Sequence, residues 1–151
     1  MLSKIYNMKR TISIIILLFI VKSFAFSQCN KSLVTSCCQN ISSDAIFLQQ
    51  YRAKLRAAEV DANLPVARFS VLLSKGNTYN LNVCSALDYE GEGVLQLYDG
   101  SKLVAETYDA ASKTNFKGFQ FFCAKTAIYK VYISFLDGKR GCAVGILSMK
   151  K

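Results

Sequence analysis

Residues 66–84 read VARFSVLLSKGNTYNLNVC, and this stretch decides the fold. Apolar residues occupy every second position on both sides of a short Lys-Gly-Asn segment, with polar residues between most of them. Such alternation is typical of a strand that buries one face, and the central glycine is typical of a turn. The stretch therefore predicts two strands whose inward side chains are Ala67, Phe69, Val71 and Leu73, then Tyr79, Leu81 and Val83.

The same pattern continues toward the C-terminus. Asp99-Gly100 stands between two apolar segments and predicts a hairpin of 94–98 with 103–107. Residues 109–115 are polar and are expected to form a connection, and Asp137–Gly141 is expected to form a turn. We expect seven strands in all, and each sheet must cover its apolar face with another layer. The predicted strands are 66–73, 78–84, 94–98, 103–107, 119–123, 129–135 and 142–149.

Residues 44–58 (DAIFLQQYRAKLRAA) are compatible with two structures. As a helix capped by Ser43 or Asp44, the segment would place its large apolar residues in one stripe. As a strand, it would alternate apolar and basic residues over 51–56. The predicted fold class is an all-β antiparallel sandwich, jelly-roll-like, with seven to eight strands. Residues 44–58 form either an eighth strand or a short N-terminal helix.

The first 27 residues have the organisation of a cleavable secretory signal. Basic residues precede an apolar run that ends near Val21, and Ala25-Phe26-Ser27 offers small residues at a cleavage site before Gln28. The run is shorter than the roughly 20 apolar residues that span a bilayer. We therefore expect a protein exported to the periplasm or the extracellular space, with no membrane span after cleavage. Its predicted parts are a signal (1–27), an irregular cysteine-containing arm (28–43) and a sandwich domain (44–151).

Removing the signal changes the charge. Four of the 19 basic residues and none of the 10 acidic residues lie before residue 28, so the net charge falls from +9 to +5. The basic residues are scattered apart from Arg52, Lys54 and Arg56, and no basic and aromatic residues interleave as they do in nucleic-acid binders. We expect no nucleic-acid partner.

Six cysteines remain after cleavage, an even number that predicts disulfides in an oxidising compartment. A hairpin of 128–135 with 142–149 would bring Cys142 level with Phe135, and a Cys123–Cys142 bridge is favoured on that basis. Cys84 lies on the polar phase of its strand, within reach of the N-terminal arm. The adjacent pair at 37–38 lacks the spacing of a zinc site. The remaining disulfide candidates are Cys29, Cys37, Cys38 and Cys84.

The sequence contains no histidine, which excludes the triads and metal centres that depend on it. Carboxylates remain, and Asp88, Glu90 and Glu92 alternate in a glycine-containing segment, 88–93. Oxygen ligands in that arrangement are a candidate calcium site, although the bidentate glutamate of an EF-hand is missing. A solvated strand connection is the other interpretation, and a carboxylate-dependent hydrolase is a third.

Five aromatic residues lie in loops or at strand positions that are not expected to face the core. They form either a surface for a protein or glycan partner or a second packed face. These residues are Tyr98, Tyr108, Phe116, Phe122 and Tyr132.

Residues 75–137 resemble bacterial pre-peptidase C-terminal domains, which are small jelly-roll modules of secreted enzymes. The resemblance is carried by KGNTYNLNVC, VLQLYDGSKLVAET and FFCAKTAIYKVYISF, in the order of that family's strands. The sequence departs from the family at EGEG, where an Asp-rich segment is usual, and at Ala127, where glycine is usual. The chain also resembles stand-alone secreted proteins of the Bacteroidetes in its final GCAVGILS strand. These resemblances imply an exported β-sandwich and do not indicate an activity.

The function predicted from the sequence is an exported, non-catalytic module, not an enzyme, that binds a protein, a glycan or an envelope component. A calcium-dependent binding module that uses segment 88–93 is the alternative. No other cofactor is expected.

Overall fold

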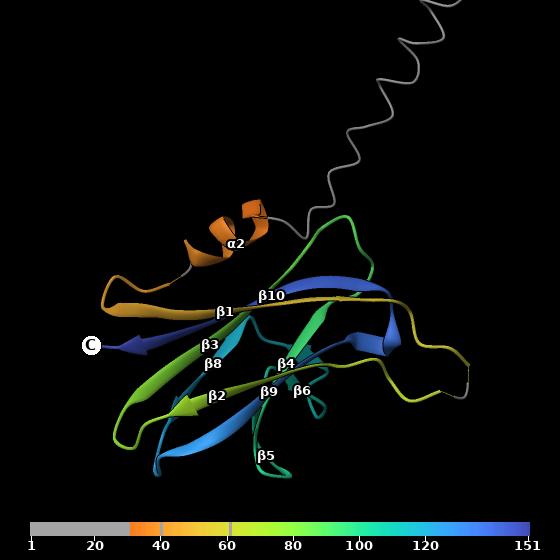
Figure 1. The fold of residues 1–151 in the computed structure, drawn as a ribbon. Helices are drawn as coiled ribbons and strands as arrows, with labels where there is room; N and C mark the ends of the chain where they lie inside the picture. The colour runs from red at the N-terminus through yellow and green to blue at the C-terminus, as the bar shows by residue number, and fades with distance from the viewer. Residues whose placement is uncertain (1–30, 40, 61) are drawn as a thin grey trace, which may run out of the picture.

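The structure is a computed structural model that describes residues 31–39, 41–60 and 62–151. The predicted signal peptide and Cys29 lie outside the described residues. Ten strands, one α-helix and one short 3-10 helix make up the described part of the chain (Figure 1). In chain order they are α2 (Lys31–Cys38), β1 (Ala45–Leu55), β2 (Ala67–Leu73), β3 (Thr78–Ser85), β4 (Gly93–Asp99), β5 (Lys102–Glu106), β6 (Tyr108–Asp109), β7 (Thr114–Asn115), β8 (Gly118–Phe122), β9 (Ala127–Phe135), η2 (Leu136–Gly138) and β10 (Gly141–Lys150).

Two four-stranded antiparallel sheets face each other. Sheet A has the order β1-β10-β3-β8 and sheet B the order β2-β9-β4-β5. The pairs β1–β10, β2–β9, β3–β8 and β4–β5 alternate between the sheets, so the chain is a long antiparallel ribbon folded over both. This winding is that of a jelly roll. The predicted fold class is confirmed.

Each predicted strand is present, with shifts of one or two residues at its ends. The hairpin at Asp99-Gly100 is also present, and Gly100 has the positive φ of 61° that such a turn requires. The polar connection 109–115 additionally contains the two-residue strands β6 and β7. The predicted hairpin of 128–135 with 142–149 is wrong, because β9 belongs to sheet B and β10 to sheet A.

The core lies between the sheets and contains the predicted inward residues. The fully buried side chains include Leu73 from β2, Leu81 from β3, Val131 and Ile133 from β9, and Leu147 from β10. Tyr51 and Ala53 of β1 are buried with them, whereas Arg52 and Lys54 are exposed. The strand interpretation of 44–58 is therefore confirmed over Ala45–Leu55.

A helix covers the outer face of sheet A, where the arm 28–43 was expected to be irregular (Figure 1). In α2, Leu33, Val34 and Cys37 form one face that packs on Val144 and Ile146 of β10. The opposite face is polar, and Thr35 and Ser36 donate hydrogen bonds from their hydroxyls to carbonyl groups one turn earlier. A helix of two turns is unstable alone, so the packing on β10 stabilises it. That packing could not be seen in the sequence.

Candidate functional site

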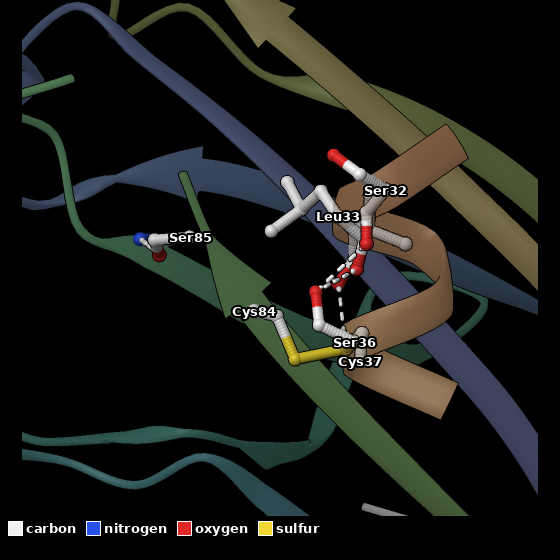
Figure 2. Close-up of a disulfide and its surroundings, with 8 residues drawn as sticks. Ser32, Leu33, Ser36, Cys37, Cys84 and Ser85 are labelled. Atoms are coloured by element: carbon white, nitrogen blue, oxygen red, sulfur yellow. Dashed lines mark hydrogen bonds between the residues drawn. A yellow bond between two sulfur atoms is a disulfide. The ribbon is translucent and has the colours of Figure 1, made fainter. Parts of the chain in front are cut away.

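Two of the predicted disulfide candidates are bonded to each other in the structure. Cys37 of α2 is bonded to Cys84 of β3, with Cα atoms 5.8 Å apart (Figure 2). The bridge fastens the helix to sheet A, as the outward position of Cys84 indicated. Cys38 and Cys123 are free thiols, and Cys142 is in a disulfide.

The predicted Cys123–Cys142 bridge is wrong. Cys123 directly follows β8, continues the inward-facing positions of that strand and belongs to the core between the sheets. Cys142 shares the phase of Val144, which faces α2 on the outer side of sheet A. The two sulfur atoms therefore lie on opposite faces of one sheet, and β3 runs between their strands.

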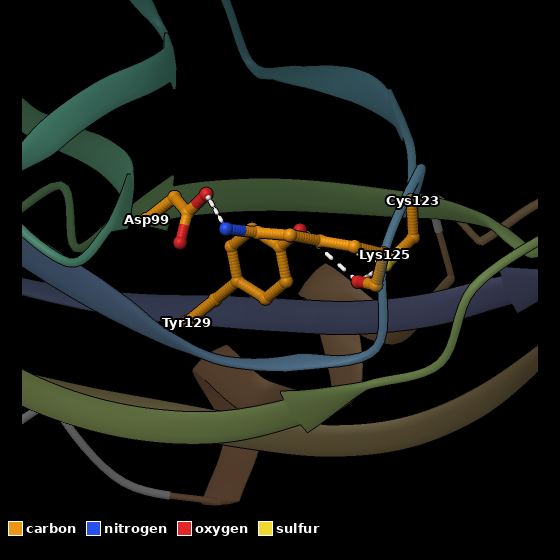
Figure 3. A network of polar contacts seen from close by, with 4 residues as sticks. All are labelled: Asp99, Cys123, Lys125 and Tyr129. Atoms are coloured by element: carbon orange, nitrogen blue, oxygen red, sulfur yellow. Dashed lines mark hydrogen bonds and ion pairs between the residues drawn. The ribbon is translucent and has the colours of Figure 1, made fainter.

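The buried Cys123 belongs to a small polar network at the edge of the core (Figure 3). Its Sγ lies 3.0 Å from the carbonyl oxygen of Lys125 and 3.8 Å from the Tyr129 hydroxyl, which donates to the same carbonyl at 3.3 Å. Lys125 Nζ lies 2.7 Å from Asp99 Oδ2. Burial, and next the contact with Cys123, raise the pKa of Tyr129 to about 12. The Cys123 thiol has no solvent access, and the Tyr129 phenol beside it stays protonated. We therefore assign this network a structural role, in which it joins the ends of β8, β9 and β4.

The acidic residues predicted as a calcium site do not gather. Asp88 and Glu90 line a hollow beside Lys139 and Arg140, whereas Glu92 lines a separate one. Among the described residues, no group of three or more histidine, cysteine or acidic side chains is arranged to hold a metal ion. The calcium site therefore receives no support from the structure.

Residues 86–92, here called the projecting loop, connect β3 to β4. The Tyr89 amide donates to the Ala86 carbonyl at 3.3 Å, which closes a β-turn with Leu87 and Asp88 at its two central positions. Leu87 is 97% exposed. The sequence analysis singled out the acids of this segment and missed the leucine at its tip.

Hydrogen bonds hold the projecting loop at both ends. The Ala86 amide donates to the Cys142 carbonyl at 2.8 Å, and the Gly91 amide donates to the Arg140 carbonyl at 2.9 Å. A Cβ on Gly91 would lie 2.8 Å from that carbonyl oxygen, so the close approach requires glycine. The Leu136 amide donates to the Glu92 carbonyl at 3.0 Å. The loop is therefore fixed to the segment between β9 and β10.

A side chain fixes the middle of the loop. The Tyr89 ring has Arg140 Cζ 5.1 Å and Lys54 Nζ 5.9 Å from its centroid. Cations at these distances from an aromatic face attract it. The turn that carries Leu87 is thus anchored immediately beside its tip.

A hollow of about 370 Å³ adjoins the projecting loop. Leu87 and Glu92 line one part of it, and Asn115, Phe116 and Lys117 line another. Asn115 donates from Nδ2 to the Gly93 carbonyl at 3.0 Å, while its buried Oδ1 has no hydrogen-bond partner among the described residues. Of the predicted exposed aromatics, Phe116 is therefore the one beside the loop.

The other predicted aromatics lie elsewhere. Tyr98 and Tyr132 form a ring pair on the outer face of sheet B, with centroids 4.8 Å apart, and Arg68 lies over Tyr132. Phe122 is exposed at the end of β8, and Tyr108 is half-buried in β6. These residues do not form one continuous surface with the projecting loop.

Comparison with known proteins bears on the fold of this chain. No protein-family model matches the sequence, and no curated protein matches it. Among solved structures, a similar one is that of PliG from Aeromonas hydrophila, a periplasmic lysozyme inhibitor of g-type lysozyme, with a TM-score of 0.51 and 7% sequence identity. The match covers 74% of this chain and 92% of that one. The likeness is one of fold. The resemblance to pre-peptidase C-terminal domains remains a prediction from the sequence.

The described helices were also compared with what a bilayer requires. None of them combines the length and the apolar character needed to cross one.

Proposed function

We propose that this protein is an exported, non-catalytic binding protein that engages another protein through the projecting loop. The observation that carries the proposal is Leu87, which is 97% exposed at the tip of a turn held on both sides. A single exposed leucine is ordinary on a protein surface. A leucine on a loop that loses little conformational freedom on binding is suited to act as an anchor for a partner.

The charge of the loop indicates the kind of surface that it fits. Asp88, Glu90 and Glu92 belong to the same loop as Leu87, whose side chain is 97% exposed. A concave partner with an apolar pocket and a basic rim is complementary to this arrangement. Glycan-cleaving enzymes of the lysozyme type are the first partners to test, because a protein of similar fold inhibits one.

The disulfide supports export. Cys37–Cys84 joins two segments that are 47 residues apart, and such bridges persist in oxidising compartments. Together with the predicted signal sequence, it supports a periplasmic or extracellular location.

The test is a binding and inhibition assay with the purified, oxidised protein against a panel of lysozymes that includes g-type enzymes. We expect inhibition of at least one member, and Leu87→Asp is expected to weaken it by about 10- to 100-fold, the effect of removing an interface anchor. Leu72→Asp is the matched control, because Leu72 is also exposed (65%) but lies on the outer face of sheet B.

Two results would overturn the proposal. The first is that no member of the panel binds the protein. The second is that Leu87→Asp and Leu72→Asp reduce binding equally, which would indicate an unspecific effect of the added charge.

A further inference from the structure

Three basic side chains surround one hollow at the edge of sheet A. Lys54 lies in β1, Arg56 directly follows it, and Arg140 directly precedes β10. The register of these strands pairs Leu55 with Gly141, so its continuation places Arg56 opposite Arg140. Leu55 and the three basic residues line a hollow of about 450 Å³, which we call the basic hollow, and no acidic residue lines it.

Contacts hold two of the three basic residues, Lys54 and Arg140. Lys54 Nζ lies 5.9 Å and Arg140 Cζ lies 5.1 Å from the centroid of the Tyr89 ring. The hydrogen bond from the Gly91 amide fixes the backbone carbonyl of Arg140. In the described part of the chain, neither Arg56 nor Arg140 forms an ion pair. Their guanidinium groups are exposed and have no carboxylate partner there.

Protection of a sheet edge does not explain this arrangement. Charged residues on an edge strand such as β1 discourage pairing with another chain. That role requires charges on β1 alone, whereas Arg140 and the adjacent Lys139 come from a different segment. Like charges placed opposite each other are unfavourable. A bound anion would offset that cost, so the convergence on one hollow suits an anionic ligand.

We propose that the basic hollow binds a phosphate-type oxyanion. Two guanidinium groups supply planar pairs of N–H donors that match such an oxyanion, and the lysine adds a point charge. Asp88 and Glu90 line the next hollow beside Arg140 and would repel a long polyanion that continued past the site. A compact group, such as a soluble phosphate ester or a lipid headgroup, is therefore favoured over nucleic acid. Leu87 does not line this site, which is therefore independent of the proposed function of the projecting loop.

The first experiment is a titration of the purified, isotope-labelled protein with sodium pyrophosphate, followed by NMR. We expect chemical-shift changes that cluster at the basic hollow and weaken as salt is added. Arg56→Gln/Arg140→Gln is expected to bind about tenfold more weakly or worse, because charge-assisted hydrogen bonds are lost. Arg56→Gln alone leaves the Tyr89 contacts intact, so it is expected to weaken binding without shifting the projecting loop.

The matched control is Lys102→Gln/Lys117→Gln, which removes two exposed charges elsewhere. Equal weakening in the control and in the arginine variant would overturn the proposal, because unspecific attraction would then explain binding. Shift changes spread over all basic residues would overturn it too, as would a short oligonucleotide that binds at the hollow more tightly than pyrophosphate.

A second experiment identifies the source of the phosphate group. The protein is sedimented with vesicles of phosphatidylglycerol or of phosphatidylcholine. Cosedimentation with the anionic vesicles alone, lost in Arg56→Gln/Arg140→Gln, supports a lipid headgroup. Pyrophosphate binding without cosedimentation supports a soluble ester. Cosedimentation that the arginine variant retains would contradict a role of the hollow at membranes.

Discussion

Two buried tyrosines differ in what their hydroxyl groups contact. Tyr51 packs its ring on Phe69, 5.1 Å between centroids, but its hydroxyl has no hydrogen-bond partner among the described residues. The Tyr129 hydroxyl donates to the Lys125 carbonyl. An unpaired buried hydroxyl opposes folding, whereas a paired one contributes.

We therefore expect Tyr51→Phe to leave the free energy of unfolding unchanged or to raise it by up to about 1 kcal/mol, and Tyr129→Phe to lower it by about 1 kcal/mol. Urea unfolding followed by circular dichroism measures both, since the sequence has no tryptophan to report by fluorescence. A clear loss of stability in Tyr51→Phe would show that its hydroxyl has a partner.

The helix α2 is the element whose stability depends most on a single covalent bond. Its apolar face is small, and Cys37–Cys84 fastens it over Val144 and Ile146. The double variant Cys37→Ser/Cys84→Ser is expected to lose about 2–4 kcal/mol, because the unfolded chain is no longer constrained across 47 residues. Urea unfolding gives the loss, and hydrogen exchange is expected to show faster exchange in α2 than in β3.

Cys38→Ser is the control for this change, because it alters the neighbouring thiol, which is free. Its stability is expected to stay within about 0.5 kcal/mol of the parent. If the double variant and the control unfold at the same urea concentration, the bridge does not stabilise the fold.

The strands could be predicted from the sequence more readily than the helix α2. The strand β1 illustrates the reason. Arg, Lys, Gln and Leu in 44–58 favour a helix by intrinsic propensity, yet Tyr51 and Ala53 are buried between the sheets as the alternation indicated. In α2 the apolar stripe is three residues long, and its partners lie more than 100 residues later in β10. Local pattern therefore predicted seven strands and left 44–58 open between strand and helix, whereas β6, β7 and α2 were not predicted.

At the scale of the whole molecule, the sequence correctly predicted the pairing of β4 with β5 but wrongly paired β9 with β10. The turn between β9 and β10 looked like that of a hairpin, but the chain crosses there from one sheet to the other. The predicted Cys123–Cys142 bridge rested on that hairpin and failed with it. The exposure of Leu87 was missed for a related reason: it follows from where the ribbon places 86–92, and its neighbours in sequence do not reveal it.

The sandwich as a whole is expected to lose stability in alkaline solution. Burial raises the pKa of Tyr51 and of Tyr129 from 10.0 to about 12. Between these values the unfolded chain releases two protons that the folded protein keeps, so the free energy of unfolding falls as the pH rises from about 10 to about 12. Below about pH 10 both states are protonated and the tyrosines contribute no slope.

The measurement is the urea midpoint as a function of pH in a Cys38→Ser background, which removes the more accessible free thiol and its exchange with the disulfides. Tyr51→Phe in this background is expected to reduce the alkaline slope by about half, because one of the two shifted groups is gone. Lys102→Gln is the control and is expected to leave the slope unchanged. Two results would contradict the burial of these hydroxyls: a urea midpoint that stays constant up to about pH 12, or an alkaline slope that Tyr51→Phe does not alter. Either result would show that the two tyrosines ionise in the folded protein without destabilising it.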